Sequence, residues 1–140
     1  MKGHCLCGAV TVTAQSAKAP HPHADACHCS MCRRWSSGPF FATEGKDVQI
    51  EGKDAVTEYA SSEWARRAFC KHCGTHLYYL FLQTQGYMLS AGLFQENADF
   101  AFTTEIYIDK KPDWYAFANA TKTMTEAEVL KAFGFAPDGN

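Results

Sequence analysis

The sequence of 140 residues predicts a mainly β fold with one short helix at the C-terminus. Two observations support this. Short stretches of β-branched and aromatic residues recur at close spacing, and a single helix-capping pattern lies near the end of the chain. Apolar residues make up 46% and charged residues 20%, which favours a packed globular core over disorder. We expect a single domain over residues 1–140.

Stretches with period-two alternation, or with clustered aromatic and β-branched side chains, predict the strands. These stretches are residues 9–13, 39–43, 48–50, 56–59, 67–69, 76–82, 87–90 and 104–108. Gly45, Gly52 and Asp54 separate neighbouring strands in this interpretation. Residues 17–23 contain two prolines, which predicts a loop. Many short strands at this spacing favour an antiparallel sheet.

The C-terminal helix begins with a capping box, in which Thr125 is followed three residues later by Glu128. Gly134 stands where a glycine often ends a helix. The apolar face of this helix consists of Val129, Leu130 and Phe133.

The charge balance argues against a nucleic-acid partner, because 13 basic and 15 acidic residues give a net charge of −2. The longest apolar run, residues 77–82, is far too short to span a bilayer, so we expect no membrane partner. The first residues lack the apolar segment of a signal peptide. We therefore expect a cytoplasmic location.

Seven cysteines form three clusters with the spacings C-x-C, C-x-C-x2-C and C-x2-C. An odd number in a chain without a secretion signal argues against a disulfide framework. Short spacings of thiol ligands indicate metal binding, most often zinc. For the four outer cysteines the alternative is free buried thiols, since cysteine also packs as a small apolar residue.

The outer clusters predict one structural zinc site made by Cys5, Cys7, Cys70 and Cys73, here called the four-cysteine cluster. Gly74 after the second C-x2-C cysteine permits the tight turn in which backbone N–H groups bond to sulfur. Four protein ligands complete a tetrahedron and leave no position for a substrate.

The middle cluster supplies three thiols, from Cys27, Cys29 and Cys32, here called the three-cysteine cluster. Three protein ligands leave one tetrahedral position open, which is typical of a reactive metal. His28 projects opposite to its neighbours if the backbone is extended. Two alternatives remain open: a closed structural site completed by His21, His23, His28 or another side chain, and a C-x2-C redox pair of Cys29 and Cys32.

A short helix beginning near Ser30 carries Arg33 and Arg34 directly after the three-cysteine cluster. Either arginine can receive a substrate carboxylate through its bidentate fork, or the pair can be solvated. Three thiolates make zinc a poor activator of water but suit it to a fourth, soft ligand such as a substrate thiol. The thiolate is nucleophilic and attacks an aldehyde to give a hemithioacetal.

Four segments in this order, CLCGAV, CHCSMCRRW, FCKHCGTHL and KKPDW, resemble the glutathione-dependent formaldehyde-activating enzyme family, also called the CENP-V/GFA domain family. The resemblance covers roughly residues 3–118. It implies a β-tent fold of small antiparallel sheets around a structural zinc. It also implies that the four-cysteine cluster holds that zinc and that the three-cysteine cluster holds a catalytic one.

The activity that the resemblance implies is the condensation of formaldehyde with glutathione to S-(hydroxymethyl)glutathione, a carbon–sulfur lyase reaction. We therefore predict a zinc-dependent enzyme with two zinc ions per chain, whose partner is a small thiol such as glutathione. Cys27, Cys29 and Cys32 are its predicted catalytic residues, and Arg33 and Arg34 are predicted to bind substrate. The alternative is a non-catalytic, zinc-stabilised binding or chaperone-like module with two structural metal sites. Redox or zinc sensing by the middle triple is a third reading.

Overall fold

The structure is a computed structural model, and it describes residues 1–96 and 98–134. The chain divides into two compact units. The first unit comprises Met1–His23 and Ala42–Ala101, and the second comprises Ala24–Phe41 and Phe102–Asn140. The assignment of a single domain to residues 1–140 stays a prediction.

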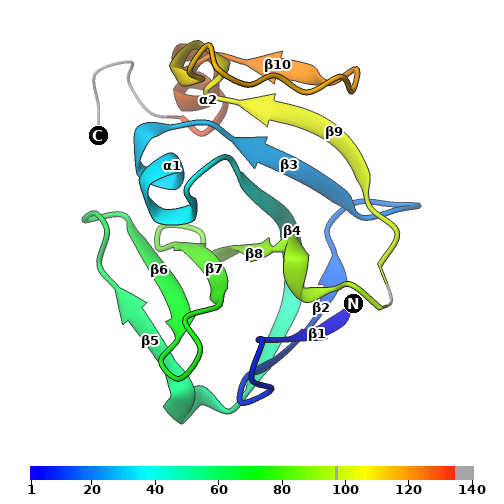
Figure 1. The fold of residues 1–140 in the computed structure, drawn as a ribbon, viewed down its shortest axis with the longest axis vertical. Coiled ribbons are helices and arrows are strands. Elements are labelled where there is room, and N and C mark those ends of the chain that lie inside the picture. The colour runs from blue at the N-terminus through cyan, green and yellow to red at the C-terminus, as the bar shows by residue number, and fades with distance from the viewer. Residues whose placement is uncertain (97, 135–140) are drawn as a thin grey trace. The chain divides into compact units, whose positions relative to one another are not determined.

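The mainly β fold class with a short C-terminal helix is confirmed. The two helices are α1 (Ser30–Ser36) and α2 (Glu126–Ala132), both marked in Figure 1. The strands are β1 (Lys2–His4), β2 (Thr11–Ser16), β3 (His23–Cys27), β4 (Phe40–Glu51), β5 (Val56–Tyr59), β6 (Ala65–Cys70), β7 (His76–Phe81), β8 (Gly86–Ser90), β9 (Ala101–Ile106) and β10 (Lys122–Met124). No helix among the described residues is long and apolar enough to cross a membrane.

In the first unit the strands lie in the order β4-β8-β7-β6-β5, and each neighbouring pair is antiparallel. The strand β2 pairs antiparallel with β1 on one side and with β4 on the other. Antiparallel neighbours joined by short turns are what the closely spaced strand signals predict.

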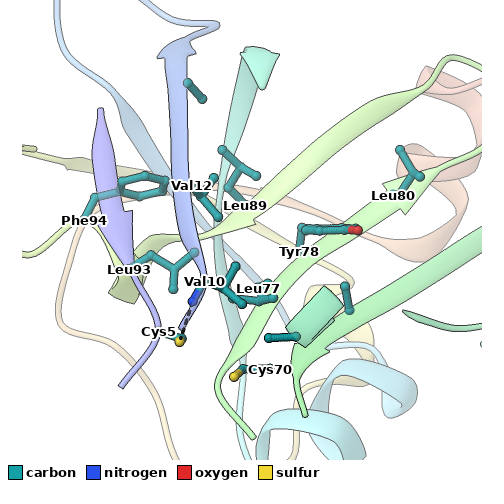
Figure 2. Packing of buried hydrophobic residues seen from close by; sticks show 13 residues of the cluster. Cys5, Val10, Val12, Cys70, Leu77, Tyr78, Leu80, Leu89, Leu93 and Phe94 are labelled. Atoms are coloured by element: carbon teal, nitrogen blue, oxygen red, sulfur yellow. Dashed lines mark hydrogen bonds between the residues drawn. The ribbon is translucent and has the colours of Figure 1, made fainter. Parts of the chain in front are cut away.

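A cluster of buried apolar side chains forms the core of the first unit (Figure 2). Val12, Leu77 and Leu89 are fully buried there, and Phe94 is almost so. Cys5 and Cys70 belong to the same cluster, and Figure 2 shows their sulfurs at one edge of it. Packing in this core therefore holds two of the four cysteines of the cluster, Cys5 and Cys70, in place.

In the second unit β9 lies between β3 and β10. The strands β9 and β10 are parallel, with Lys122 opposite Thr104 and Met124 opposite Ile106. This differs from the predicted all-antiparallel arrangement. The reason is the long connection over residues 107–121, which returns the chain to the starting end of β9, as a parallel pair requires.

The helix α2 begins as its capping box predicts, because the Thr125 hydroxyl accepts a hydrogen bond from the Glu128 N–H at 3.3 Å. Val129 and Leu130 are buried, and Gly134 follows the helix with a φ of +79°. Phe133, predicted on the apolar face, is instead exposed. It stands at the C-cap, where the helical periodicity that placed it on that face no longer applies.

Two strands predicted separately, residues 39–43 and 48–50, are one strand, β4. Gly45 does not break it. A Cβ atom at Gly45 would lie 2.6 Å from Cδ1 of Leu89, so the glycine leaves room for a core side chain on the neighbouring strand. The strands β1, β3 and β10 were not predicted, and each has five residues or fewer.

Two candidate metal centres

The four-cysteine cluster assembles in the first unit from two turns that are far apart in the sequence. The sulfur of Cys7 lies 3.7 Å from that of Cys5 and 3.8 Å from that of Cys70, and all four sulfurs lie within 4.8 Å of one another. Four sulfurs around one zinc at about 2.3 Å stand about 3.8 Å apart in a regular tetrahedron. A disulfide would bring two sulfurs to about 2 Å, and all seven cysteines are free. The cluster therefore fits a tetrahedral metal ion.

Glycine shapes both turns. Gly8 and Gly74 have φ values of +80° and +76°, which L side chains rarely adopt. Their N–H groups donate to the carbonyls of Cys5 and Cys70 at 3.0 and 2.7 Å. The Val10 N–H donates to the Cys5 sulfur at 3.3 Å (Figure 2).

The surroundings of this cluster favour at least one thiolate. The Thr75 hydroxyl lies 3.2 Å from the Cys73 sulfur, and hydrogen bonds from Thr75 lower the pKa of Cys73 to about 5. A hydrogen bond to the charged form stabilises it, and the thiolate is the form that binds metal.

The three-cysteine cluster assembles in the second unit where β3 runs into α1. Cys27 ends β3, Cys29 is the N-cap of α1, and Cys32 is buried within the helix. The Cys29 sulfur accepts the N–H of Cys32 at 3.3 Å, while the Cys29 carbonyl accepts the N–H of Arg33 at 2.9 Å. This cap turns the chain so that the three sulfurs lie within 4.8 Å of one another.

The donor set suits a cation. The neighbouring sulfurs of Cys29 and Cys32, together with burial, raise the pKa of the Cys27 thiol. Three thiolates repel one another without a positive charge between them. A divalent ion that prefers sulfur removes that repulsion, so the residues present fit zinc.

His28 supplies no ligand to this cluster. It is fully buried, and both of its ring nitrogens have other partners. Nε2 lies 2.8 Å from Oε1 of Glu105, and Nδ1 lies 2.7 Å from the Tyr115 hydroxyl. The site closed by His28 is therefore wrong. Within the part of the chain that the structure describes, no histidine or carboxylate joins the three sulfurs, so His21 and His23 are not in the group either.

The two arginines differ. Arg33 is half-buried, and its Nε donates to the His28 carbonyl at 2.9 Å, so it helps hold the loop between two of the cysteines. Arg34 is exposed. Arg33 is therefore not a purely solvated side chain, whereas the exposure of Arg34 agrees with the solvated interpretation as well as with substrate binding. Their role in binding substrate stays a prediction.

Three further residues beside the cluster were not predicted: Glu105, Tyr115 and Thr121. They lie 77 to 93 residues after His28 in the sequence, and no short motif links them to it. The hydroxyl of Thr121 donates to Oε2 of Glu105 at 2.5 Å, which completes the hydrogen bonding of that buried carboxylate. The sequence feature that could have pointed to Tyr115 is its position directly after the KKPDW segment.

The chain belongs to the glutathione-dependent formaldehyde-activating enzyme family, because the model of this family matches residues 1–110. The fold and the two cysteine clusters agree with this assignment. A Schizosaccharomyces pombe protein named "uncharacterized lyase" is 38% identical over 133 residues, which is 94% of this chain and 95% of that protein. A crystal structure of a Rhodobacter sphaeroides protein has a similar fold, with a TM-score of 0.59 and 23% identity. That similarity covers 72% of this chain and 100% of the other.

Proposed function

We propose that the protein is a zinc-dependent carbon–sulfur lyase-type enzyme that joins a small thiol, such as glutathione, to an aldehyde, such as formaldehyde. The observation that carries this proposal is the three-cysteine cluster. Its three sulfurs lie together, and no histidine, carboxylate or further cysteine among the described residues joins them as a fourth ligand. Membership of the family and the lyase name of the relative support the same reaction class.

The reaction is an addition without oxidation or reduction. The substrate sulfur forms a bond to the carbonyl carbon, the carbon–oxygen π bond breaks, and the oxygen receives the proton that the thiol gives up. The product is a hemithioacetal, which is S-(hydroxymethyl)glutathione for glutathione and formaldehyde. The reverse reaction breaks the carbon–sulfur bond and releases the aldehyde.

Two zinc ions per chain complete the proposal. The four-cysteine cluster holds a structural ion, and Cys27, Cys29 and Cys32 hold a catalytic one. Zinc held by these three cysteines would supply positive charge that favours the thiolate form of a substrate thiol.

The chain's own residues orient the site and the substrate. Cys29 is held as the N-cap of α1. The hydrogen bond from Arg33 to the His28 carbonyl holds the backbone between Cys27 and Cys29. Arg33 and Arg34 are the residues we propose to receive the carboxylates of glutathione. A reducing cytoplasm suits a protein that works with free thiols.

Exchange kinetics test the proposal. In a mixture of glutathione and formaldehyde, magnetisation-transfer NMR measures how fast the hydroxymethyl group leaves and rejoins sulfur. We expect the zinc-loaded protein to raise this rate above the uncatalysed background, and Cys29→Ser to return it to background. A wild-type rate equal to background would support the binding-module alternative.

A further inference from the structure

His28 has a hydrogen-bond partner at all four of its polar atoms. Its N–H donates to the Ile106 carbonyl at 3.0 Å, and its carbonyl accepts Nε of Arg33 at 2.9 Å. Its ring nitrogens lie 2.8 Å from Oε1 of Glu105 and 2.7 Å from the Tyr115 hydroxyl. His28 is also 0% exposed. Buried polar groups with their partners in place have little freedom to move, so His28 is a fixed point of the second unit.

This fixed point lies between two cysteines of the three-cysteine cluster, Cys27 and Cys29. The His28 N–H belongs to the peptide group that joins it to Cys27, and the His28 carbonyl belongs to the peptide group that joins it to Cys29. Each peptide group is planar, so a hydrogen bond to one of its atoms restrains the whole group. The partners of His28 therefore restrain the backbone from which both cysteine side chains project.

The ring of His28 ties this loop to segments far along the chain. Glu105 lies in β9 and is 6% exposed, and its second oxygen accepts the hydroxyl of Thr121. Tyr115 lies in the connection between β9 and β10, directly after the KKPDW segment. The Nζ of Lys111, in that segment, donates to the Tyr115 carbonyl and stands 5.1 Å from the centre of its ring. Both ring contacts of His28 thus go to residues that have further partners of their own.

Aromatic packing surrounds the same ring. The ring centroids of Tyr115 and Phe117 lie 5.6 and 6.0 Å from that of His28, and 6.2 Å from each other. These contacts depend on the rings and not on the Tyr115 hydroxyl. Removing that hydroxyl alone therefore breaks one hydrogen bond to His28 and leaves the packing in place.

We propose, resting on the assignment of zinc to the three-cysteine cluster in the proposed function, that His28 clamps the metal-binding loop. The clamp holds residues 27–29 against β9 and the connection that follows it. Glu105, Tyr115 and Thr121 are positioning residues of the clamp, and Lys111 gives the KKPDW segment its part in it. A loop without the clamp must lose backbone freedom when it closes on an ion, and that loss opposes binding. The clamp therefore raises the affinity of the three-cysteine cluster for zinc.

Chelator competition on the zinc-loaded protein measures the affinity of each centre separately. The backbone amide resonances of residues 27–32 follow the ion at the three-cysteine cluster, and those of residues 70–74 follow the ion at the four-cysteine cluster. Tyr115→Phe removes the hydroxyl at Nδ1 of His28 and keeps the packed ring. We expect it to weaken zinc binding at the three-cysteine cluster about 3- to 10-fold, the effect of one hydrogen bond. Zinc binding at the four-cysteine cluster should not change.

Matched variants separate the clamp from general stability. Thr121→Val removes the hydroxyl that holds Glu105 and should weaken zinc binding at the three-cysteine cluster, and Thr121→Ser should restore it. Thr103→Val is the control. Its hydroxyl also lies on β9, but it donates to Oδ1 of Asp25 in β3 at 3.2 Å. We expect this control to lower the melting temperature without changing the zinc affinity of either cluster.

Hydrogen exchange at the His28 N–H measures the clamp directly. When chelator has emptied the three-cysteine cluster, we expect this amide to exchange slowly in the wild type and faster in Tyr115→Phe. Equal exchange rates, equal zinc affinities of these two proteins, or the same loss of affinity in Thr103→Val would overturn the clamp and leave the proposed function intact.

The proposed function can fail in two distinguishable ways. If the three-cysteine cluster of the wild type binds no zinc, the proposed function and the clamp are both overturned. If it binds zinc with the expected dependence on Tyr115, but the exchange of the hydroxymethyl group stays at background, the proposed function alone is overturned.

Discussion

The two adjacent arginines illustrate how neighbouring residues of one type take different tasks. Arg33 is half-buried and donates to the His28 carbonyl, whereas Arg34 is exposed. Removing Arg33 is therefore expected to disturb the loop that carries two cysteines of the three-cysteine cluster. Arg34 is the cleaner probe of substrate binding, because the described contacts give it no part in that loop.

Arg34→Ala is expected to weaken glutathione binding about 2- to 5-fold, roughly the value of one exposed ion pair. Binding of 2-mercaptoethanol, which has no carboxylate, should not change. Calorimetry with both thiols measures the difference. Equal affinities of wild type and variant for glutathione would remove Arg34 from the substrate site.

His28 shows what the local sequence pattern does and does not reveal. Its place between Cys27 and Cys29 in an extended segment predicts that it points away from them, and its ring nitrogens are indeed engaged elsewhere. Its partners were not predictable, because Glu105 lies in β9 and Tyr115 in the connection after it, both distant in the sequence. Such long-range pairing is set by how the strands and turns pack, which short motifs do not encode.

At the scale of the elements, glycines decide where turns and strands meet closely. Gly52 and Gly74 have nearly equal φ values, +80° and +76°. A Cβ atom at Gly52 would lie 2.0 Å from the Ala9 carbonyl oxygen, while one at Gly74 would meet nothing within 4 Å. The same backbone conformation therefore has different packing consequences at the two positions.

Gly74→Ala is expected to lower the free energy of unfolding by about 1–2 kcal/mol, the cost of a left-handed conformation with a side chain. Gly52→Ala should lower it by about 1–3 kcal/mol more, because the backbone at Ala9, just before β2, must shift. Denaturant titrations of the zinc-loaded variants compare them. Equal losses at both positions would contradict this account of the Gly52 contact.

The strands were predictable to different degrees for physical reasons. Residues 56–59 were bounded correctly, since glycine and aspartate precede them and the strand is short. The merging of two predicted strands into β4 was not foreseen, because Gly45 signals a break locally yet serves packing against Leu89. The strand β3 was not predicted because its five residues include no β-branched side chain and no Phe, Tyr or Trp.

At the scale of the whole chain, the two cysteine clusters stand in different surroundings. The four-cysteine cluster includes two residues of the buried core of the first unit, Cys5 and Cys70. The three-cysteine cluster stands on a strand end and a short helix of the second unit, and two of its cysteines are only partly buried. Sequence spacing alone predicted both ligand sets. Their membership in separate units depends on packing and was not predicted.

Cys70→Ser is expected to release the structural ion and unfold the first unit, because zinc binding at a closed site contributes directly to folding. Cys29→Ser should release the other ion with a much smaller loss of stability. Metal analysis, thermal melts and residue-resolved hydrogen exchange distinguish the variants. Equal destabilisation by the two substitutions would contradict the assignment of one structural and one catalytic site.

The central claim is that the three-cysteine cluster binds its substrate thiol directly through sulfur. X-ray absorption at the zinc edge measures the average number of sulfur ligands per zinc in the fully loaded protein. The account predicts that saturating glutathione raises this number, because a lighter ligand at the open position is replaced by sulfur. An unchanged sulfur number at saturating glutathione would contradict it.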